Sequence, residues 1–181
     1  PYLVDSMMGR MDIRSDSKQE LVKVGVPFLL AFQVTDVTDG TCKPLQGAQV
    51  DIWHCDANGV YSGASDPGFD TTGQDWLRGY QITDETGTAK FLTIYPGWYS
   101  GRAVHIHFKI RTDPDSEQGY EFTSQLFFDD AFSEDIYQLQ PYNNGRGEHD
   151  TPNDEDNIFE NSEGLLTLAL TELTVDELEE D

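Results

Sequence analysis

The chain has 181 residues, of which 37% are hydrophobic and 12% aromatic, so we expect one domain over 1–181 built around one ordinary core. Its 34 Asp and Glu against 11 Lys and Arg give a formal net charge of −23 at pH 7. This charge repels nucleic-acid phosphates and anionic membrane surfaces, so we expect no nucleic-acid partner and no membrane partner. Within the domain we expect an extended N-terminal segment at 1–25 and an acidic tail at 174–181.

Most acidic side chains are expected to be solvated, because the aromatic content is too high for a disordered acidic chain. Such acidity fits either a secreted protein or one from a high-salt medium. One acidic cluster lacks the spacing and the central Gly of a calcium loop. We therefore predict no calcium site among Asp150, Asp154, Glu155 and Asp156.

Short apolar or alternating runs between turn residues predict a series of strands. In chain order they are expected at 26–36, 48–54, 79–83, 88–94, 103–111, 122–128 and 165–173. The turn sequence Asp84–Gly87 favours a hairpin between the third and fourth of these strands. One short helix is predicted from Ala131 to Leu139, capped by Asp130 and ended before Pro141. The pattern predicts an all-β fold, an antiparallel β-sandwich with long loops forming a metal site at one end and one short helix.

Cys42 and Cys55 are the two cysteines of the chain. They flank a short segment that would turn one strand into the next, so a disulfide between them is feasible. A bridge of this kind fits an oxidising compartment. We therefore expect the protein to be secreted. The alternative to a disulfide is that both cysteines are free, small side chains packed in the core.

The tripeptide His105-Ile106-His107 is the most informative pattern in the sequence. On a strand, residues i and i+2 face the same side, so both imidazoles can converge on one metal ion. Upstream, a Pro-Gly turn directs Tyr99 toward this strand, and Tyr61 begins a long loop after its own turn. A phenol, with a pKa near 10, binds only a strongly acidic metal ion, which favours Fe(III) over zinc.

Four segments together resemble the intradiol ring-cleavage dioxygenases. They are Ala48–Ser62, Leu77–Asp84, Thr93–Tyr99 and Gly101–Phe108, inside a match that runs from about Val26 to Phe128. The joint motif is specific because separated ligand positions occur in the family's order with the family's flanking residues.

This resemblance implies a mononuclear non-haem Fe(III) bound by Tyr61, Tyr99, His105 and His107. It implies that Tyr99 leaves the metal when substrate binds, that Tyr61 stays, and that a solvent hydroxide is a further ligand. Arg102 and Gln125 match the family's pair of residues behind the ligands, with Arg102 able to stabilise developing negative charge. The implied reaction is cleavage of catechol-type diols by O2 to muconate-type diacids.

Two departures from the family pattern lead to further expectations. The catechol-cleaving relatives carry an N-terminal helical dimerisation region, whereas about 25 mostly polar residues precede the first predicted strand here. We therefore expect a monomer or a weak homo-oligomer. Only five residues separate Tyr99 from His105, which predicts a shallow, open site that accepts several catechols, as in the secreted branch of the family.

Two other functions remain open at this point. A zinc-dependent hydrolase or lyase could use the His-x-His pair with a third histidine, which would have to be His54 or His149. Alternatively, the chain could be a non-catalytic β-sandwich binding module whose Tyr and His side chains are incidental. Colour distinguishes the three, because only a ferric phenolate absorbs visible light.

Overall fold

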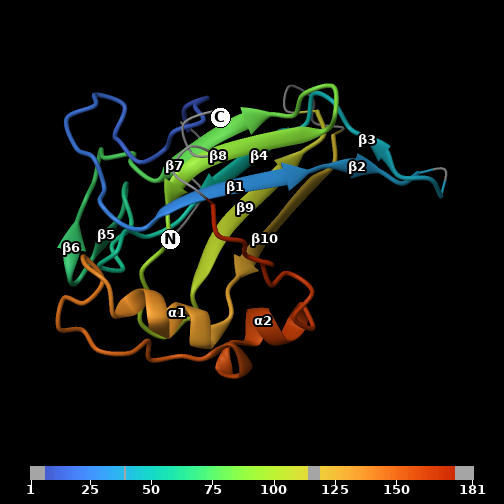
Figure 1. Cartoon of the computed structure of the whole chain (residues 1–181). Helices are drawn as coiled ribbons and strands as arrows, with labels where there is room; N and C mark the ends of the chain where they lie inside the picture. Colours follow the sequence, from blue (N-terminus) through green and yellow to red (C-terminus); the bar gives the residue numbers. More distant parts are fainter. Residues whose placement is uncertain (1–6, 39, 114–118, 174–181) are drawn as a thin grey trace.

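The computed structural model describes residues 7–38, 40–113 and 119–173. These residues form ten strands and two short α-helices. In Figure 1 the helices lie beneath one end of the strands. The strands are β1 Pro27–Gln33, β2 Thr35–Asp36, β3 Lys43–Pro44, β4 Gln49–Trp53, β5 Ser65–Asp66, β6 Phe69–Asp70, β7 Arg78–Ile82, β8 Thr88–Ile94, β9 His105–Arg111 and β10 Glu121–Phe127. The helices are α1 Asp130–Tyr137, the 3₁₀ turn η1 Asn153–Glu155 and α2 Asn157–Asn161.

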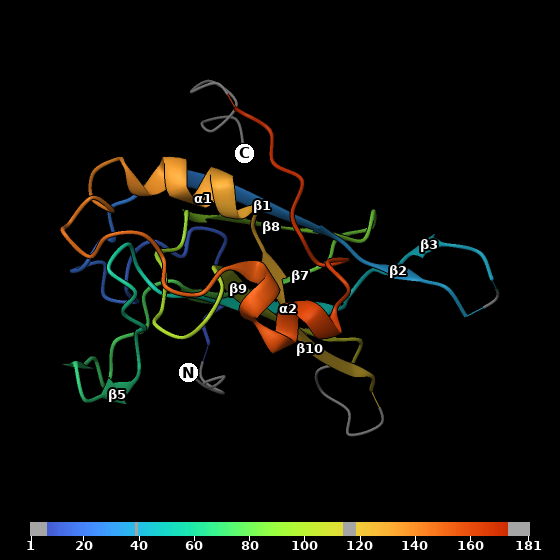
Figure 2. The same ribbon diagram turned by 90° about the horizontal axis from the view of Figure 1, so that it is seen from below.

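Two antiparallel sheets face each other, which confirms the predicted sandwich (Figure 2). One sheet has the strand order β10-β9-β4-β7, and the other pairs β1 with β8. The turn Asp84–Gly87 forms as predicted, with the Gly87 N–H donating to the Asp84 carbonyl at 2.9 Å. However, β7 and β8 belong to different sheets, so the predicted hairpin is wrong: the turn carries the chain from one layer to the other.

The core lies between the two sheets. Val50 and Ile52 of β4 and Ile106 of β9 are completely buried there, facing Phe91 of β8. Side chains alternate along a strand, so the neighbours of these residues on β4 and β9 point to the opposite face of the four-stranded sheet. That outer face carries the histidines.

The strand predicted at 165–173 is absent. Instead, Thr167 forms a single isolated bridge with Phe127, and the Leu168 N–H donates to the Phe127 carbonyl at 2.8 Å. Leu168 and Leu170 pack against the inter-sheet core. The apolar alternation therefore reflects burial of alternate leucines against the core, without a neighbouring strand to pair with.

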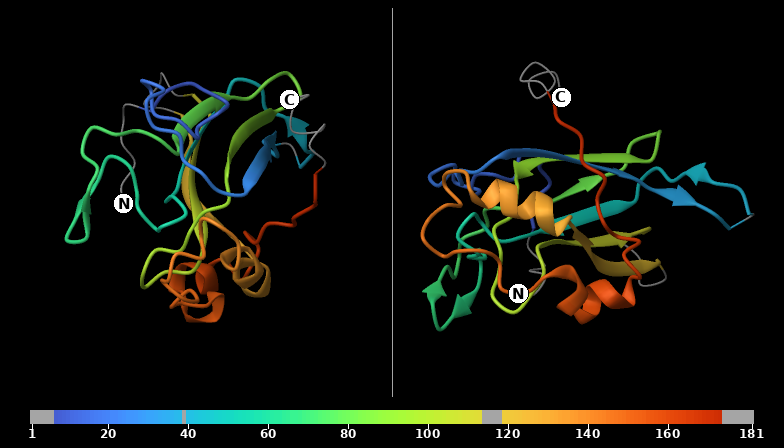
Figure 3. Two further views of the ribbon diagram at one scale, coloured as in Figure 1. Left: turned by 60° about the vertical axis from the view of Figure 1, so that its left-hand side comes forward. Right: turned by 60° about the horizontal axis from the view of Figure 1, so that its bottom comes forward.

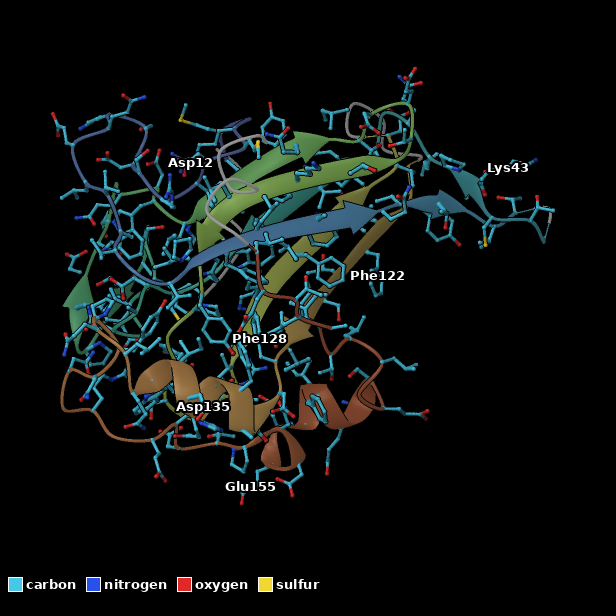
Figure 4. The ribbon with its side chains drawn as sticks, viewed as in Figure 1. Asp12, Lys43, Phe122, Phe128, Asp135 and Glu155 are labelled. Carbon is cyan, nitrogen blue, oxygen red and sulfur yellow. The ribbon has the colours of Figure 1, made fainter. Side chains whose placement is uncertain are left out.

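The predicted helix is present but begins and ends earlier than expected. It spans Asp130–Tyr137, and its cap is Asp129, whose carboxylate accepts the Phe132 N–H at 2.9 Å. Asp129 and Asp130 are both good caps, and the strand end at Phe127 decides which of them is used. Phe128, at the junction of β10 and α1 in Figure 4, is completely buried between the helix and the sheets.

Cys42 and Cys55 are both free, so the expected disulfide is wrong. Cys42 is exposed next to the β2–β3 hairpin, which projects from the body of the protein in Figure 1. Cys55 is buried at the end of β4, and its thiol donates to the Gly97 carbonyl at 3.1 Å. Strands β3 and β4 lie between the two cysteines in the chain, so one thiol is exposed and the other is buried.

Outside the sheets, the two ends of the described chain lie against the sandwich (Figure 3). The segment 7–25 is largely irregular and touches both sheets through isolated bridges, Gly9 with Tyr80 and Asp12 with Leu92. The predicted acidic tail at 174–181 lies outside the described residues. Within the described ranges, no helix combines the length and apolarity needed to cross a membrane.

Candidate metal centre

One row of side chains crosses the outer face of the four-stranded sheet at one end. Strand register places His107 of β9 directly between Gln125 of β10 and Trp53 of β4, and Trp53 is paired in turn with Arg78 of β7. The indole of Trp53 stacks on the His107 ring, with centroids 4.8 Å apart and planes 1° from parallel. His105 is two residues before His107 and therefore shares this face.

Three donor atoms meet beside this row. His105 Nε2 lies 3.1 Å from His107 Nε2 and 3.2 Å from the Tyr61 hydroxyl. His105 Nδ1 donates to the Ala103 carbonyl at 2.6 Å, and this contact leaves Nε2 with a free lone pair. The predicted convergence of the two histidines is present, and Tyr61 reaches the same point.

Burial determines the charge state of these groups. All three side chains are at least nine-tenths buried, because the exposed fractions of Tyr61, His105 and His107 are 1%, 3% and 8%. Desolvation lowers the pKa of His105 to about 4 and that of His107 well below its usual 6.5, so both imidazoles are neutral at pH 7. Desolvation also raises the pKa of Tyr61 well above 10. Only a strongly electron-withdrawing cation would convert this phenol into a phenolate.

A tight turn after β4 delivers Tyr61 to the centre. The Asp56 carboxylate accepts the N–H groups of Asn58 and Val60, at 2.9 and 3.1 Å, and closes the turn. Lys23, from the N-terminal segment, pairs with the second oxygen of Asp56 at 2.8 Å. The predicted turn is therefore confirmed, and it is braced by a residue that the sequence had not associated with it.

Tyr99 lies near this cluster but makes a different contact. Its ring is 5.6 Å from the Tyr61 ring, in an edge-on arrangement, and its hydroxyl donates to Asp66 at 2.8 Å. Asp66 belongs to the small β5–β6 hairpin in the loop after Tyr61. The hydrogen bond to this carboxylate raises the pKa of Tyr99, because it stabilises the neutral phenol.

Arg102 and Gln125 form a pair, as predicted. Arg102 Nη2 donates to Gln125 Oε1 at 2.6 Å, and Arg102 Nε donates to Asp156 Oδ2 at 2.7 Å. Gln125 is buried on the strand beside His107, whereas Arg102 is half-buried in the loop between Tyr99 and His105. Arg102 therefore adjoins the centre through Gln125, the strand neighbour of His107.

Comparisons with known proteins identify the family of this chain. Residues 2–140 match the sequence model of a family described as Dioxygenase. A solved structure, an intradiol ring-cleavage dioxygenase from Tetranychus urticae, is 30% identical, covers 99% of this chain and 84% of its own length, and has a TM-score of 0.79. The chain belongs to the intradiol ring-cleavage dioxygenase family.

Two further dioxygenases also match. The dioxygenase domain of a carbohydrate-binding fusion protein from Streptomyces sp. SirexAA-E is 26% identical, with a TM-score of 0.63, over 96% of this chain and 85% of that domain. A chlorocatechol 1,2-dioxygenase from Pseudomonas putida is 30% identical over 51% of this chain and 40% of its own length. The match thus spans well under half of that curated relative.

The donor set of this member of the intradiol family fits a ferric ion better than zinc. In the described part of the chain, no three His, Cys, Asp or Glu side chains lie together in a way that could hold a metal ion. His54 uses both ring nitrogens, on the Cys55 carbonyl and the Thr93 hydroxyl, and His149 lies against Asp130 and Glu134 of α1. A three-histidine zinc site is therefore not formed, and the available donors include phenols.

Sequence reasoning missed three of the residues that shape the centre. Trp53 was recognised only as part of an alternating strand, and Asp66 as part of a loop. Asp156 was assigned to a solvated cluster, yet its exposed fraction is 2%. Only for Trp53 did the sequence contain a usable signal, since it has the parity of a residue on the outer face of β4.

Proposed function

We propose that this chain cleaves catechol-type aromatic diols between the two hydroxyl-bearing carbons, using O2, to give muconate-type dicarboxylic acids. The single observation that supports this most is the convergence of Tyr61, His105 and His107 at contacts of 3.1 and 3.2 Å in a chain of the intradiol family. The reaction balances with no further reactant, because both atoms of O2 enter the product as carboxyl oxygens.

In this proposal the cofactor is a non-haem Fe(III), held by Tyr61, Tyr99, His105 and His107. Bound Fe(III) would supply the Lewis acidity that deprotonates the diol and draws charge from its ring, so that O2 can react with a ring carbon. The neutral, buried imidazoles fit this role because each offers a lone pair without adding charge.

The chain itself provides places for protons. A diol loses two protons when it chelates a metal, and the Tyr99 oxygen can hold one of them. The Asp66 carboxylate, 2.8 Å away, stabilises Tyr99 as a neutral phenol. In the described part of the chain the Tyr61 hydroxyl faces His105 Nε2 and no carboxylate, and Tyr61 is 1% exposed, so it is the phenol that stays in place. Tyr99 thus takes one of the two protons, and solvent hydroxide takes the other, so no further side chain has to act as a base.

Arg102 would stabilise negative charge that develops on the reacting diol. Its guanidinium is fixed by Gln125 and Asp156, and it adjoins the centre through Gln125, the strand neighbour of His107. Tyr99 and Arg102 are half-buried, whereas Tyr61, His105 and His107 are buried. We therefore propose that the diol reaches the centre past Tyr99 and Arg102. A fixed charge of this kind acts most strongly where water is excluded.

The test is the colour and the product of the iron-loaded protein. We expect a visible phenolate-to-iron absorption that shifts when catechol is added without O2, and a diacid containing both atoms of labelled O2 when air is admitted. A colourless protein that binds zinc, or a coloured one that leaves catechol intact, would contradict the proposal. Tyr99→Phe serves as the control, because it removes one phenolate from the spectrum.

The range of substrates stays a prediction, based on the short loop between Tyr99 and His105. We propose an open site that accepts several catechols, and kinetics with a panel of bulkier diols would contradict this if only one were cleaved. The charge of −23 predicts slower encounter with anionic diols than with neutral ones, a difference that added salt should reduce.

Two properties of the whole protein are also proposals. We propose a monomer or weak homo-oligomer. A stable dimer in static light scattering at micromolar concentration would contradict this. We propose export on the strength of the acidic composition alone, since the free cysteines remove the support that a disulfide would have given. Fractionation of the source cells would test it.

A further inference from the structure

The acidic segment after α1 lies beyond the family match, which ends at residue 140. Two of its carboxylates bind the loop that connects Tyr99 with His105. Asp150 accepts the Ser100 hydroxyl at 2.6 Å and the Gly101 N–H at 2.9 Å. Asp156 accepts the Arg102 Nε–H at 2.7 Å and the Ala103 N–H at 3.0 Å, so it binds a side chain of the loop as well as its backbone.

Asp156 occupies both of its oxygens. Oδ2 accepts the two bonds from the loop, while Oδ1 accepts the N–H groups of Ile158 and Phe159 and so caps α2 at 2.9 and 3.2 Å. The side chain of Asp156 is 1% exposed, so these contacts replace water completely. A buried carboxylate with this many donors is rigid, because moving it would leave several polar groups without partners.

The guanidinium of Arg102 is thereby held on one edge. Nε and Nη2 face Asp156, at 2.7 and 3.4 Å, and Nη2 also reaches Gln125. Among the residues that the structure describes, Nη1 has no hydrogen-bond partner. One nitrogen of a fixed, half-buried guanidinium beside the centre is thus left to meet a bound molecule.

We propose that Asp156 is the positioning residue for Arg102: it fixes the guanidinium so that Nη1 can contact the negative charge that develops on the diol. This rests on the proposed function of the centre. Asp150 anchors only the backbone of the same loop, and its contacts do not include the guanidinium. Asp150 is therefore the matched control, since it lies in the same segment and binds the same loop.

The first measurement does not require iron or turnover. Hydrogen exchange of the Arg102 Nε–H, assigned by NMR through its loss in Arg102→Lys, should be slow in the wild-type protein and at least tenfold faster in Asp156→Asn. Asp150→Asn should leave it unchanged. The wild-type protein alone can overturn the proposal, if Arg102 Nε exchanges as fast as Nε of Arg146, whose hydrogen bond to the Trp98 carbonyl uses Nη1.

The second measurement is steady-state cleavage of catechol by the iron-loaded protein. We expect Asp156→Asn to lower kcat about 10- to 100-fold with little change in KM, because an interaction made in the transition state is lost. Asp156→Glu, which keeps the charge, should recover part of kcat. The double variant Arg102→Lys with Asp156→Asn should lose little more than Arg102→Lys alone.

Each result has a defined meaning. Equal kcat in Asp156→Asn and Asp150→Asn, or losses that multiply in the double variant, would overturn the positioning role. If the wild-type protein shows slow Nε exchange but does not cleave catechol, the proposed function fails while the anchoring of Arg102 stands. Should Asp156→Asn fail to fold, the exchange rates of the wild-type protein and Asp156→Glu still decide the matter.

Discussion

The two tyrosines of the centre differ in burial and in the partners of their side chains. Tyr61 is 1% exposed and follows a turn closed by Asp56, which is itself paired with Lys23. Tyr99 is half-buried, follows a Pro-Gly turn and gives its hydroxyl to Asp66. Tyr61 is therefore enclosed by the body of the protein, whereas Tyr99 has Asp66 as a partner outside the cluster of Tyr61, His105 and His107.

The two segments nevertheless touch. Gly97, just before Tyr99, approaches the Tyr61 turn so closely that a Cβ there would lie 2.5 Å from the Asp56 carbonyl oxygen. The Gly97 N–H donates to the same oxygen at 3.2 Å. The backbone of both segments is therefore fixed, and the contrast between the tyrosines is confined to side chains and to what they meet.

The largest expected effect separates the two phenols directly. Tyr61→Phe should lose bound iron and its colour, by more than the roughly 10- to 100-fold loss of affinity seen when only a supporting partner is removed. Tyr99→Phe should retain iron, with a shifted visible absorption. Metal analysis and spectra of the purified variants check this, and equal iron loss in both variants would remove the distinction.

The next prediction weakens the support of Tyr61. Lys23→Met should reduce the free energy of unfolding by about 3 kcal/mol, because it leaves the buried Asp56 carboxylate without its cation. It also removes the ammonium that lies 3.6 Å from the centre of the Trp76 ring. Urea denaturation measures the change. The exposed Lys18→Met is the control, with a change expected within about 0.5 kcal/mol.

A pH effect of similar size is expected at the same turn. His54 directly follows β4, and desolvation lowers its pKa to about 4 from 6.5. The unfolded chain therefore binds a proton more readily than the folded one between pH 6.5 and pH 4. Stability is lost as pH falls through this window, by about 3 kcal/mol at pH 4.

In His54→Gln this part of the pH dependence should disappear, so the stability curve between pH 7 and pH 4 becomes shallower. Urea denaturation at several pH values makes the comparison, since the other three histidines contribute equally to both proteins. Identical slopes in the two proteins would show that His54 is not the group responsible.

The smallest predicted effect concerns the movable phenol. Asp66→Ala removes the acceptor of the Tyr99 hydroxyl and should favour Tyr99 on the metal, so that catechol, which must displace it, binds about tenfold more weakly. Anaerobic spectral titration with catechol measures this. The neighbouring Ser65→Ala should leave the titration unchanged, and a tighter titration in Asp66→Ala would reverse the assigned role.

The sequence by itself determined the strand pattern and the convergence of His105 with His107, because both follow from the two-residue period of a strand. It also placed Tyr61 after a turn, since the turn preferences of Asp and Gly act within four neighbouring residues. It was wrong where long-range pairing decides: 165–173 found no partner strand, the strands around Asp84–Gly87 went to different sheets, and Cys42 and Cys55 stayed apart.

Only the tertiary structure assigned partners to the acidic side chains. Asp56, Asp66 and Asp156 are indistinguishable in sequence from the many solvated acids of this chain, because their roles depend on residues far away that fold against them. Lys23 reaches Asp56, Tyr99 reaches Asp66, and Arg102 reaches Asp156. Local pattern fixes which way a side chain points, whereas the packing of distant segments decides what it meets.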